Sequence, residues 1–374
     1  MNKVNFTPKI RRKTYLLLLF TSFIIAAFNL SKINFSNFFL SEEEHLSHND
    51  IAQMIKAKYD KNLNTFPSYK ASHYAARIYR ISGNTTYLNY NLVDLKSMIG
   101  KIEQLLLFVN NEIEFSKTRA EGWPLEERSS LRRETLAIAP AFPYYLHSLN
   151  ILRRASEYQI CSAKFDRLIE HVLVYDYIHD LSDPIMIKAW AAQLANVVTW
   201  IKHIGGEDYT EVFINTIQQV YPDNEDHLLT TQQYENKLYG LTHIILANSQ
   251  YYQYAISRND FAWIFDYFDT HINTIISRAK ADVIAEIGIA YLLAGEYENH
   301  TFKKTRQAIA KQYNSLHQMI PGLNNNYDIT TGAHRNILAI MLLSSPKKFY
   351  PGPRLGQILE ITPLPKDIYN CDIR

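Results

Sequence analysis

The sequence contains few of the residues that interrupt helices. Twelve glycines and 13 prolines occur in 374 residues, whereas these two types together usually make up about 12% of a chain. An all-β sandwich or barrel needs many tight turns, and such turns depend on glycine and proline. The composition therefore excludes an all-β fold and favours a helical one.

An excess of charge of either sign is also missing. Lysine and arginine number 39 against 37 aspartates and glutamates, so the net charge is +2. A nucleic-acid-binding domain usually has a pronounced basic surplus, and we therefore expect no nucleic-acid partner. Hydrophobic residues still make up 47% of the chain, which excludes wholesale disorder.

The short motifs of several enzyme classes are absent. The chain has no HExxH or CxxC pattern, no EF-hand loop, no GxSxG elbow and no glycine-rich phosphate loop. Gly205-Gly206 ends a predicted helix instead of beginning one, so it is no phosphate site. Serine-hydrolase and nucleotide-dependent chemistry are therefore disfavoured, and we expect no cofactor.

Cysteine is scarce as well. Cys161 and Cys371 are the two cysteines of the chain, too few for a disulfide scaffold. They form either one bridge, which would tie the tail to the middle of the domain, or two unrelated thiols. The sequence leaves both alternatives open.

One long apolar run occurs, near the N-terminus. Residues 14–30 are uncharged and follow five basic residues, and about 17–25 apolar residues span a bilayer as a helix. The basic flank keeps the N-terminus in the cytoplasm and sends the remainder across. A cleaved signal peptide fits less well, because Ile25-Ala26-Ala27 is a poor cleavage site and the bulky Phe28 follows. We predict an uncleaved single-pass anchor.

The rest of the chain divides by composition into three parts. After the basic tail and anchor (residues 1–30), residues 31–48 have no sustained hydrophobic period and are predicted to form a stalk. Residues 49–345 show helical spacing throughout and are predicted to form one all-α domain. Residues 346–374 contain five prolines, so we expect an irregular C-terminal strap.

The predicted helices after residue 180 are of two kinds. Four are apolar on nearly all sides, namely 184–203, 238–249, 281–294 and 333–344. Those between them, 207–220, 260–278 and 300–318, each have a polar face. A helix without a polar face is buried all round, so this alternation predicts two layers of helical hairpins. No common solenoid period occurs, and we therefore expect a closed (α/α) toroid. Another helix is predicted over 162–180, begun by Ser162.

Three of the apolar helices carry polar side chains. These residues are Tyr239 and His243 on the first, Asp282 and Glu286 on the second, and His334, Arg335 and Asn336 on the third. A buried charge without a partner is costly. In a toroid the inner helices converge on one cleft, and we expect these groups to surround it. Glu286 and Arg335 could instead form one buried ion pair without chemistry.

The segments around these residues, LYGLTHIILANSQYYQ, FAWIFDYFDTHI, ADVIAEIGIAYLLAG and GAHRNILAIMLL, occur in that order. Over roughly residues 130–355 the chain resembles a bacterial domain-of-unknown-function family found mainly in marine gammaproteobacteria. The family motif is usually GEHRN, whereas Ala333 stands at the second position here. The resemblance implies an extracytoplasmic bacterial protein and supplies no activity. Together with the predicted anchor, it leads us to expect a single-pass protein of the bacterial inner membrane with its C-terminal domain in the periplasm.

The polar residues suit three kinds of chemistry. In a polysaccharide lyase, His243, His334 and Tyr239 would act as acid and base while Arg335 and Asn336 hold a uronic carboxylate. In a glycoside hydrolase, Glu286 would pair with Asp282 or Asp328. A metal site of His243, Glu286 and His334 is a third, weakly signalled alternative. Trp123, in a charged loop, is a candidate for stacking on sugar.

The sequence thus predicts a membrane-anchored polysaccharide lyase or glycoside hydrolase outside the cytoplasm, with a glycan as its partner. The alternative is a non-enzymatic scaffold or glycan- or peptide-binding protein of the cell envelope. A scaffold needs no histidine, glutamate and arginine on buried helices, whereas an enzyme does. The oligomeric state does not follow from the sequence.

Overall fold

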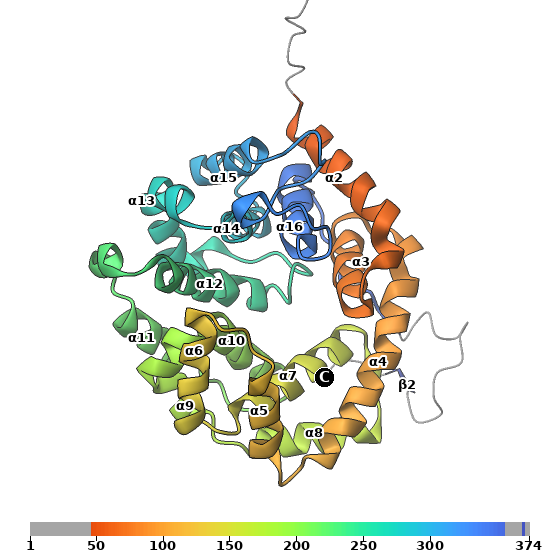
Figure 1. Ribbon diagram of the computed structural model, residues 1–374, viewed down its shortest axis with the longest axis vertical. Helices are drawn as coiled ribbons and strands as arrows, with labels where there is room; N and C mark the ends of the chain where they lie inside the picture. Colours follow the sequence, from red (N-terminus) through yellow and green to blue (C-terminus); the bar gives the residue numbers. More distant parts are fainter. Residues whose placement is uncertain (1–45, 356–368, 371–374) are drawn as a thin grey trace, which may run out of the picture. The chain divides into compact units, whose positions relative to one another are not determined.

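The computed structural model describes residues 46–355 and 369–370 (Figure 1). The predicted anchor, most of the stalk and most of the C-terminal strap lie outside these residues. Within the described part of the chain, no helix is both long enough and apolar enough to cross a membrane. A compact unit begins at His48, and the site lies within it.

The described region is helical, which confirms the predicted all-α class. Its helices are α2 (His48–Asn62), α3 (Ser68–Ser82), α4 (Leu88–Leu107), α5 (Glu112–Glu121), α6 (Glu127–Glu134), α7 (Phe142–Glu157), α8 (Ala163–Leu173), α9 (Ile178–Ser182), α10 (Pro184–His203), α11 (Thr210–Val220), α12 (Thr231–Asn248), α13 (Ala262–Arg278), α14 (Ala281–Leu293), α15 (His300–Lys311) and α16 (Ala333–Ser344). Two-residue strands β1 (Ile160–Cys161) and β2 (Tyr369–Asn370) pair antiparallel.

Side-chain caps fix where several helices begin. Asp183 accepts hydrogen bonds from the backbone N–H groups of Ile185 and Met186 at the start of α10. Thr230 and Gln233 form a reciprocal capping box at the start of α12. Each cap satisfies N–H groups that have no partner inside the helix. The two helices that carry much of the site therefore begin at defined residues.

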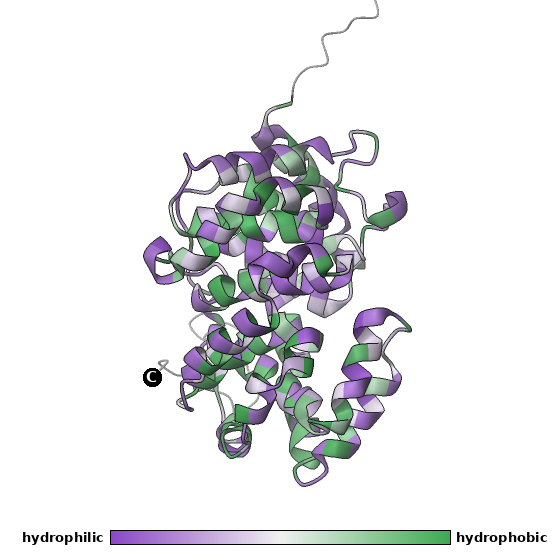
Figure 2. Ribbon diagram, turned by 90° about the vertical axis from the view of Figure 1, so that its left-hand side faces the viewer, coloured by the Kyte–Doolittle hydropathy of each residue, from purple (hydrophilic) through white to green (hydrophobic). Residues whose placement is uncertain are grey.

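Burial along the chain alternates as the sequence predicts. Helices α10, α12, α14 and α16 are buried on nearly all sides, whereas α11, α13 and α15 bury one face each. Hydrophobic residues gather where helices face one another, and hydrophilic residues cover the outward sides (Figure 2). The apolar helices thus form the inner part of the domain.

The inner helices pack in a continuous circuit. Helix α7 packs on α10, α10 on α12, α12 on α14, α14 on α16 and α16 on α3. Helix α3 packs on α4, and α4 packs in turn on α7 (Figure 1). The succession therefore returns to its starting helix, and α16 also contacts α2. Side chains from helices distant in sequence can meet inside this circuit.

The predicted helix over 162–180 is two helices instead of one, α8 and α9. The Tyr177 hydroxyl donates to the carbonyl of Val172 over 2.9 Å. The carboxylate of Asp176 accepts a hydrogen bond from the backbone N–H of Ile178 over 3.0 Å. Side chains thus take over the backbone groups that a continuous helix would pair, and the helix breaks there.

The predicted helix over 300–318 also ends early, because α15 stops at Lys311. The side-chain oxygen of Asn314 accepts from the backbone N–H of His317 over 2.9 Å, and Asn314 forms a β-bridge with Met319. Asparagine favours such a turn, since its side chain competes with the helical backbone bonds. An irregular segment therefore connects α15 to α16.

The short strands tie the end of the chain to the middle of the domain. Cys161 of β1 lies opposite Tyr369 of β2. Cys161 is disulfide-bonded, and Cys371, the other cysteine of the chain, lies outside the described residues. The alternative of a free thiol at Cys161 is therefore excluded.

Candidate functional site

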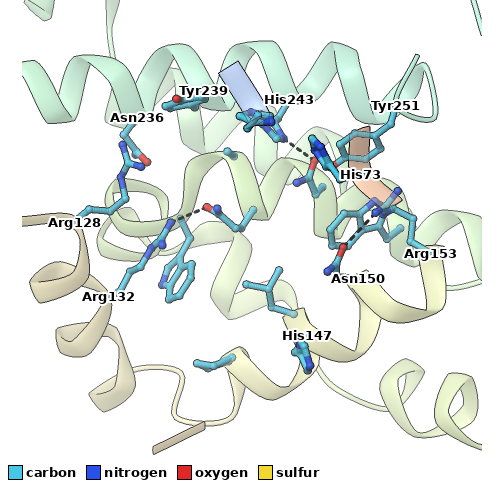
Figure 3. A pocket seen from close by; sticks show the side chains of 18 of the residues that line it. His73, Arg128, Arg132, His147, Asn150, Arg153, Asn236, Tyr239, His243 and Tyr251 are labelled. Carbon is cyan, nitrogen blue, oxygen red and sulfur yellow. Dashed lines mark hydrogen bonds between the residues drawn. The ribbon is translucent and has the colours of Figure 1, made fainter. Parts of the chain in front are cut away.

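A cavity of about 570 Å³ lies inside the circuit of helices. Figure 3 shows Tyr239 and His243 of α12 on one side and His147, Asn150 and Arg153 of α7 on the other. Residues of α3, α5, α6, α10, α14 and α16, together with Trp123 and Tyr251 from loops, complete its lining. Polar side chains from eight helices therefore face one space.

The structure brings together five of the predicted site residues. Tyr239, His243, Glu286, His334 and Trp123 all line this cavity. The first two lie one turn apart on α12, Glu286 lies on α14, and His334 lies in the first turn of α16. Trp123 precedes α6, and its ring meets the ring of Trp190 edge-on at 5.5 Å.

Glu286 stands between two histidines. Its Oε1 atom lies 3.8 Å from Nε2 of His243 and 3.6 Å from Nε2 of His334. Its Oε2 atom accepts a hydrogen bond of 2.8 Å from the hydroxyl of Thr242. This hydrogen bond holds the carboxylate in place. The Glu286 side chain is 2% exposed, so water hardly reaches it. The carboxylate can therefore act strongly on either imidazole.

His243 is oriented from its other ring nitrogen. Its Nδ1 atom lies 3.0 Å from Oδ1 of Asn196 (Figure 3); because that oxygen only accepts, Nδ1 donates and Nε2 keeps its lone pair. Burial lowers the pKa of His243, Glu286 opposes this effect, and the charges of His334 and Arg77 add to it. The imidazole is therefore neutral near pH 7, with a basic nitrogen 3.8 Å from Glu286.

The hydroxyl group of Tyr239 is hydrogen-bonded within the protein. It donates to Oδ2 of Asp282 over 2.6 Å, and burial, followed by the charge of Asp282, raises the pKa of Tyr239 well above its usual range. Asp282 does not line this cavity; it lines a separate hollow of about 960 Å³. Tyr239 thus offers its ring to the cavity, whereas its proton stays with Asp282.

Arg335 and Asn336 lie away from the cavity. The Nε atom of Arg335 donates to the carbonyl of Ile320 over 3.2 Å, and the amide of Asn336 bonds both backbone groups of Ile320. Successive residues of a helix point about 100° apart, so they cannot all share the direction of His334. This placement corrects the expectation that they hold a substrate carboxylate there. The considered ion pair of Arg335 with Glu286 is not formed either.

Six arginines line the cavity, and none was predicted from the sequence. They are Arg77, Arg80, Arg119, Arg128, Arg132 and Arg153. Arg80 and Arg153 form ion pairs with Glu157. Within residues 46–355 the other four have no ion pair. Arg77 is one of these four; it is buried, with 8% of its surface exposed, and its Nε atom has no hydrogen-bond partner. Glu286 is the one carboxylate residue among the described residues that line the cavity.

Two further histidines add no charge to the cavity at neutral pH. Burial lowers the pKa of His147 to about 3, with Arg119 and Lys101 contributing. Burial likewise lowers the pKa of His73 well below its usual range. These two histidines therefore contribute nothing to the positive field of the cavity, whereas the guanidinium groups stay charged and contribute to it.

A sequence signal for these residues exists at helical spacing. His73 and Arg77 lie one turn apart on α3, as do Arg128 and Arg132 on α6. Such pairs lie on one helix face, and on an amphipathic helix this face ordinarily contacts bulk solvent. Here it contacts the cavity, and that difference depends on tertiary packing.

A metal is not supported by the arrangement. Across the part of the chain that the structure describes, no group of three or more histidine, cysteine, aspartate or glutamate side chains is placed to hold a metal ion. The alternative of His243, Glu286 and His334 as metal ligands is therefore not supported.

Residues 48–370 match the model of a protein family described as a domain of unknown function, DUF3541. This match includes residues 130–355 and confirms that the chain belongs to a domain-of-unknown-function family. No curated protein and no solved structure matches the chain significantly.

Proposed function

The chain belongs to the DUF3541 family, and we propose that this member cleaves a polysaccharide containing uronic acid by elimination. The observation that carries the proposal is a neutral, oriented His243 beside Glu286, in a cavity with four guanidinium groups that no described carboxylate pairs. Guanidinium groups bind carboxylates and other oxyanions through strong, charge-assisted hydrogen bonds.

Elimination begins at the carbon that carries the uronic carboxyl group. Nε2 of His243 takes the proton from this carbon as general base. The C–H electron pair shifts towards the carboxylate, and Arg77, whose charge acts on His243, stabilises the extra negative charge. The same electrons then form a carbon–carbon double bond while the glycosidic C–O bond at the neighbouring carbon breaks.

Glu286 and His334 complete the proton transfers. When His243 becomes an imidazolium, the carboxylate of Glu286 at 3.8 Å stabilises it. His334 enters the reaction as an imidazolium, with Nε2 at 3.6 Å from the same oxygen, and becomes neutral when it donates a proton to the departing sugar oxygen. One proton is taken and one is given, so the products are an unsaturated uronic acid and a free hydroxyl group.

Hydrolysis by paired carboxylates is less well supported. A glycoside hydrolase uses two carboxyl groups that flank the scissile bond. Glu286 lines the cavity, but Asp282 lies behind Tyr239 and bonds its hydroxyl. Asp328 is exposed and caps the turn at Thr331. Elimination needs one base, one acid and cations, and the cavity contains all of these.

The aromatic side chains of the cavity fit a sugar ligand. The rings of Tyr239, Trp123 and Tyr251 line it, and flat apolar faces next to polar groups suit sugar rings. Tyr239 was expected to act as an acid; because its proton is held by Asp282, we assign it a packing role against the substrate instead.

We further propose that the circuit of helices is the (α/α) toroid expected from the sequence and that the domain lies in the periplasm, held by the helix at residues 14–30. The return of the packing succession to its first helix supports the toroid. The disulfide at Cys161 supports an oxidising compartment, because disulfides rarely persist in the cytoplasm.

The test uses the full chain extracted in detergent and a panel of uronic-acid polymers. Elimination creates a double bond conjugated with the carboxyl group, so ultraviolet absorbance should rise with each cleavage. His243→Gln should abolish this rise, whereas His227→Gln, at an exposed histidine outside the cavity, should not. New reducing ends without absorbance would indicate a hydrolase, and binding without cleavage would indicate a scaffold.

A further inference from the structure

Helix α6 places two arginines at one end of the cavity. Arg128 and Arg132 lie one turn apart, and both line the space opposite α12 (Figure 3). Like charges at this spacing repel each other, and the charge of Arg128 contributes to the lowered pKa of Arg132. Among the described residues neither arginine has an ion pair with a carboxylate, so no direct carboxylate contact offsets the repulsion within this part of the chain.

Arg132 is fixed in position without being neutralised. Its Nε atom donates to the carbonyl of Ala189 and its Nη2 atom to Oε1 of Gln193, both over 3.1 Å. Its guanidinium carbon lies 4.2 Å from the ring centroid of Trp190. Burial lowers the pKa of Arg132 to about 10, the charge of Arg128 adds to this, and Glu126 weakly opposes it. Ala189, Gln193 and Trp190 thus orient the guanidinium group of Arg132, and none of them carries a negative charge.

The third arginine of this helix behaves differently. Arg133 donates to the backbone carbonyls of Trp123 and Pro124 and does not line the cavity. It thus fixes the loop before α6. Because this loop is held by Arg133, the other two arginines are free of that structural role.

Tyr239 separates this pair from the proposed base. Its ring centroid lies 6.3 Å from that of His243 and 5.6 Å from Cζ of Arg128. A group bound by α6 therefore lies one aromatic ring away from the reacting carbon. Adjacent units of a sugar chain span such a separation.

From this geometry we infer that Arg128 and Arg132 form a second anion subsite, which binds a sulfate or carboxylate group on the sugar unit next to the one that is cleaved. The inference rests on the proposed function for the identity of the cleaved unit. The subsite selects polymers that carry negative charge on consecutive units. A polymer with neutral alternate units leaves the two guanidinium groups unpaired.

The first experiment compares the wild-type full chain with the variant Arg128→Gln/Arg132→Gln. The control is Arg167→Gln, at an exposed arginine of α8 outside the cavity. For a polymer charged on every unit, KM should rise about tenfold per arginine lost, with kcat nearly unchanged. For a polymer with neutral alternate units, KM should hardly change. Equal effects on both polymers would overturn the inference.

The second experiment separates the subsite from catalysis. Dextran sulfate contains no uronic acid and cannot be eliminated, so calorimetry measures its binding without catalysis, and the double variant shows how much of that binding depends on Arg128 and Arg132. Binding that is lost in the double variant and retained in His243→Gln and in Arg167→Gln supports the subsite even if no polymer is cleaved. Polygalacturonate in the same assay shows whether a carboxylate suffices. Retention of both polymers by a folded double variant contradicts the inference.

Discussion

Oδ1 of Asn196 accepts the Nδ1 proton of His243 over 3.0 Å. This single contact determines which nitrogen of His243 can act as the proposed base: a neutral imidazole carries one proton, and a proton that Asn196 holds on Nδ1 leaves the lone pair on Nε2. Asn196 lies on α10 and His243 on α12, two helices that pack directly on each other. The orientation of the base is therefore a property of this helix pair.

The pH dependence of cleavage should follow the pKa of His243. The base must be neutral, and its pKa lies below the usual value near 6.5, so kcat/KM should stay constant as the pH falls below 6.5 before it declines. Asn196→Asp places a negative charge beside the imidazole of His243, which should raise its pKa and move this decline to higher pH. Asn150→Asp, which adds a charge beside Arg153 instead, should leave the decline in place. A profile unchanged by Asn196→Asp would contradict the assignment of His243 as base.

Glu286→Gln should separate catalysis from folding. Glutamine can still accept the hydrogen bond of Thr242, and no arginine loses an ion-pair partner through this change. The free energy of unfolding should therefore change by less than about 1 kcal/mol. Loss of the charge that stabilises the imidazolium should lower kcat by roughly 10²–10⁴-fold. Thermal unfolding and initial rates measure the two effects. A large drop in Tm with normal kcat would make Glu286 a structural residue.

Arg77→Met should stabilise the protein while it weakens substrate binding. Arg77 is a buried charge with no carboxylate partner among the described residues, and its removal should raise the free energy of unfolding by about 1 kcal/mol. The Kd for a uronic-acid polymer should rise at least about tenfold. Arg80→Met is the contrasting variant on the same helix: it takes away one of the two arginines that pair with Glu157, so its Tm should fall. A lower Tm for Arg77→Met would show that Arg77 serves stability.

The effect of His334→Gln on the rate should depend on the leaving group of the substrate. Without the donor, the rate on the natural polymer should fall about 10²–10⁴-fold. A substrate whose departing oxygen belongs to an acidic phenol needs no proton at that step, so its rate should change little. His73→Gln is the control, since His73 lines the same cavity and its ring lies 5.2 Å from that of His334. Equal losses on both substrates would remove His334 from this role.

The fold was largely predictable because most of its signals are local. Apolar residues all round α14, an acidic N-cap with Pro184 at α10, and Gly205-Gly206 after it predict those elements from neighbouring residues alone. The errors at Val174–Tyr177 and after Lys311 occurred where a tyrosine hydroxyl or an asparagine side chain bonds the backbone. These bonds depend on side-chain rotamers that hydrophobic spacing does not report.

The candidate site was predictable only on buried helices. Tyr239, His243, Glu286 and His334 interrupt apolar sequences, and such interruptions are visible in the sequence. Arg128 and Arg132 lie at helical spacing, but their helix is polar elsewhere too, so this spacing does not distinguish them from residues that face solvent. Arg335 was included because it follows His334 directly, although the next residue of a helix points elsewhere. Which polar face meets a cavity and which meets solvent is decided by packing.

A closed circuit of helices has a seam, and here it joins α16 to α2 and α3. These helices stand at opposite ends of the helical region, so their contact is the least local of the fold and closes the longest loop. His334 lies on α16. A chain that lacks α16 can form neither its contacts with α2, α3 and α14 nor the approach of His334 to Glu286. The lining of the cavity at His334 therefore depends on the contacts that are most distant in sequence.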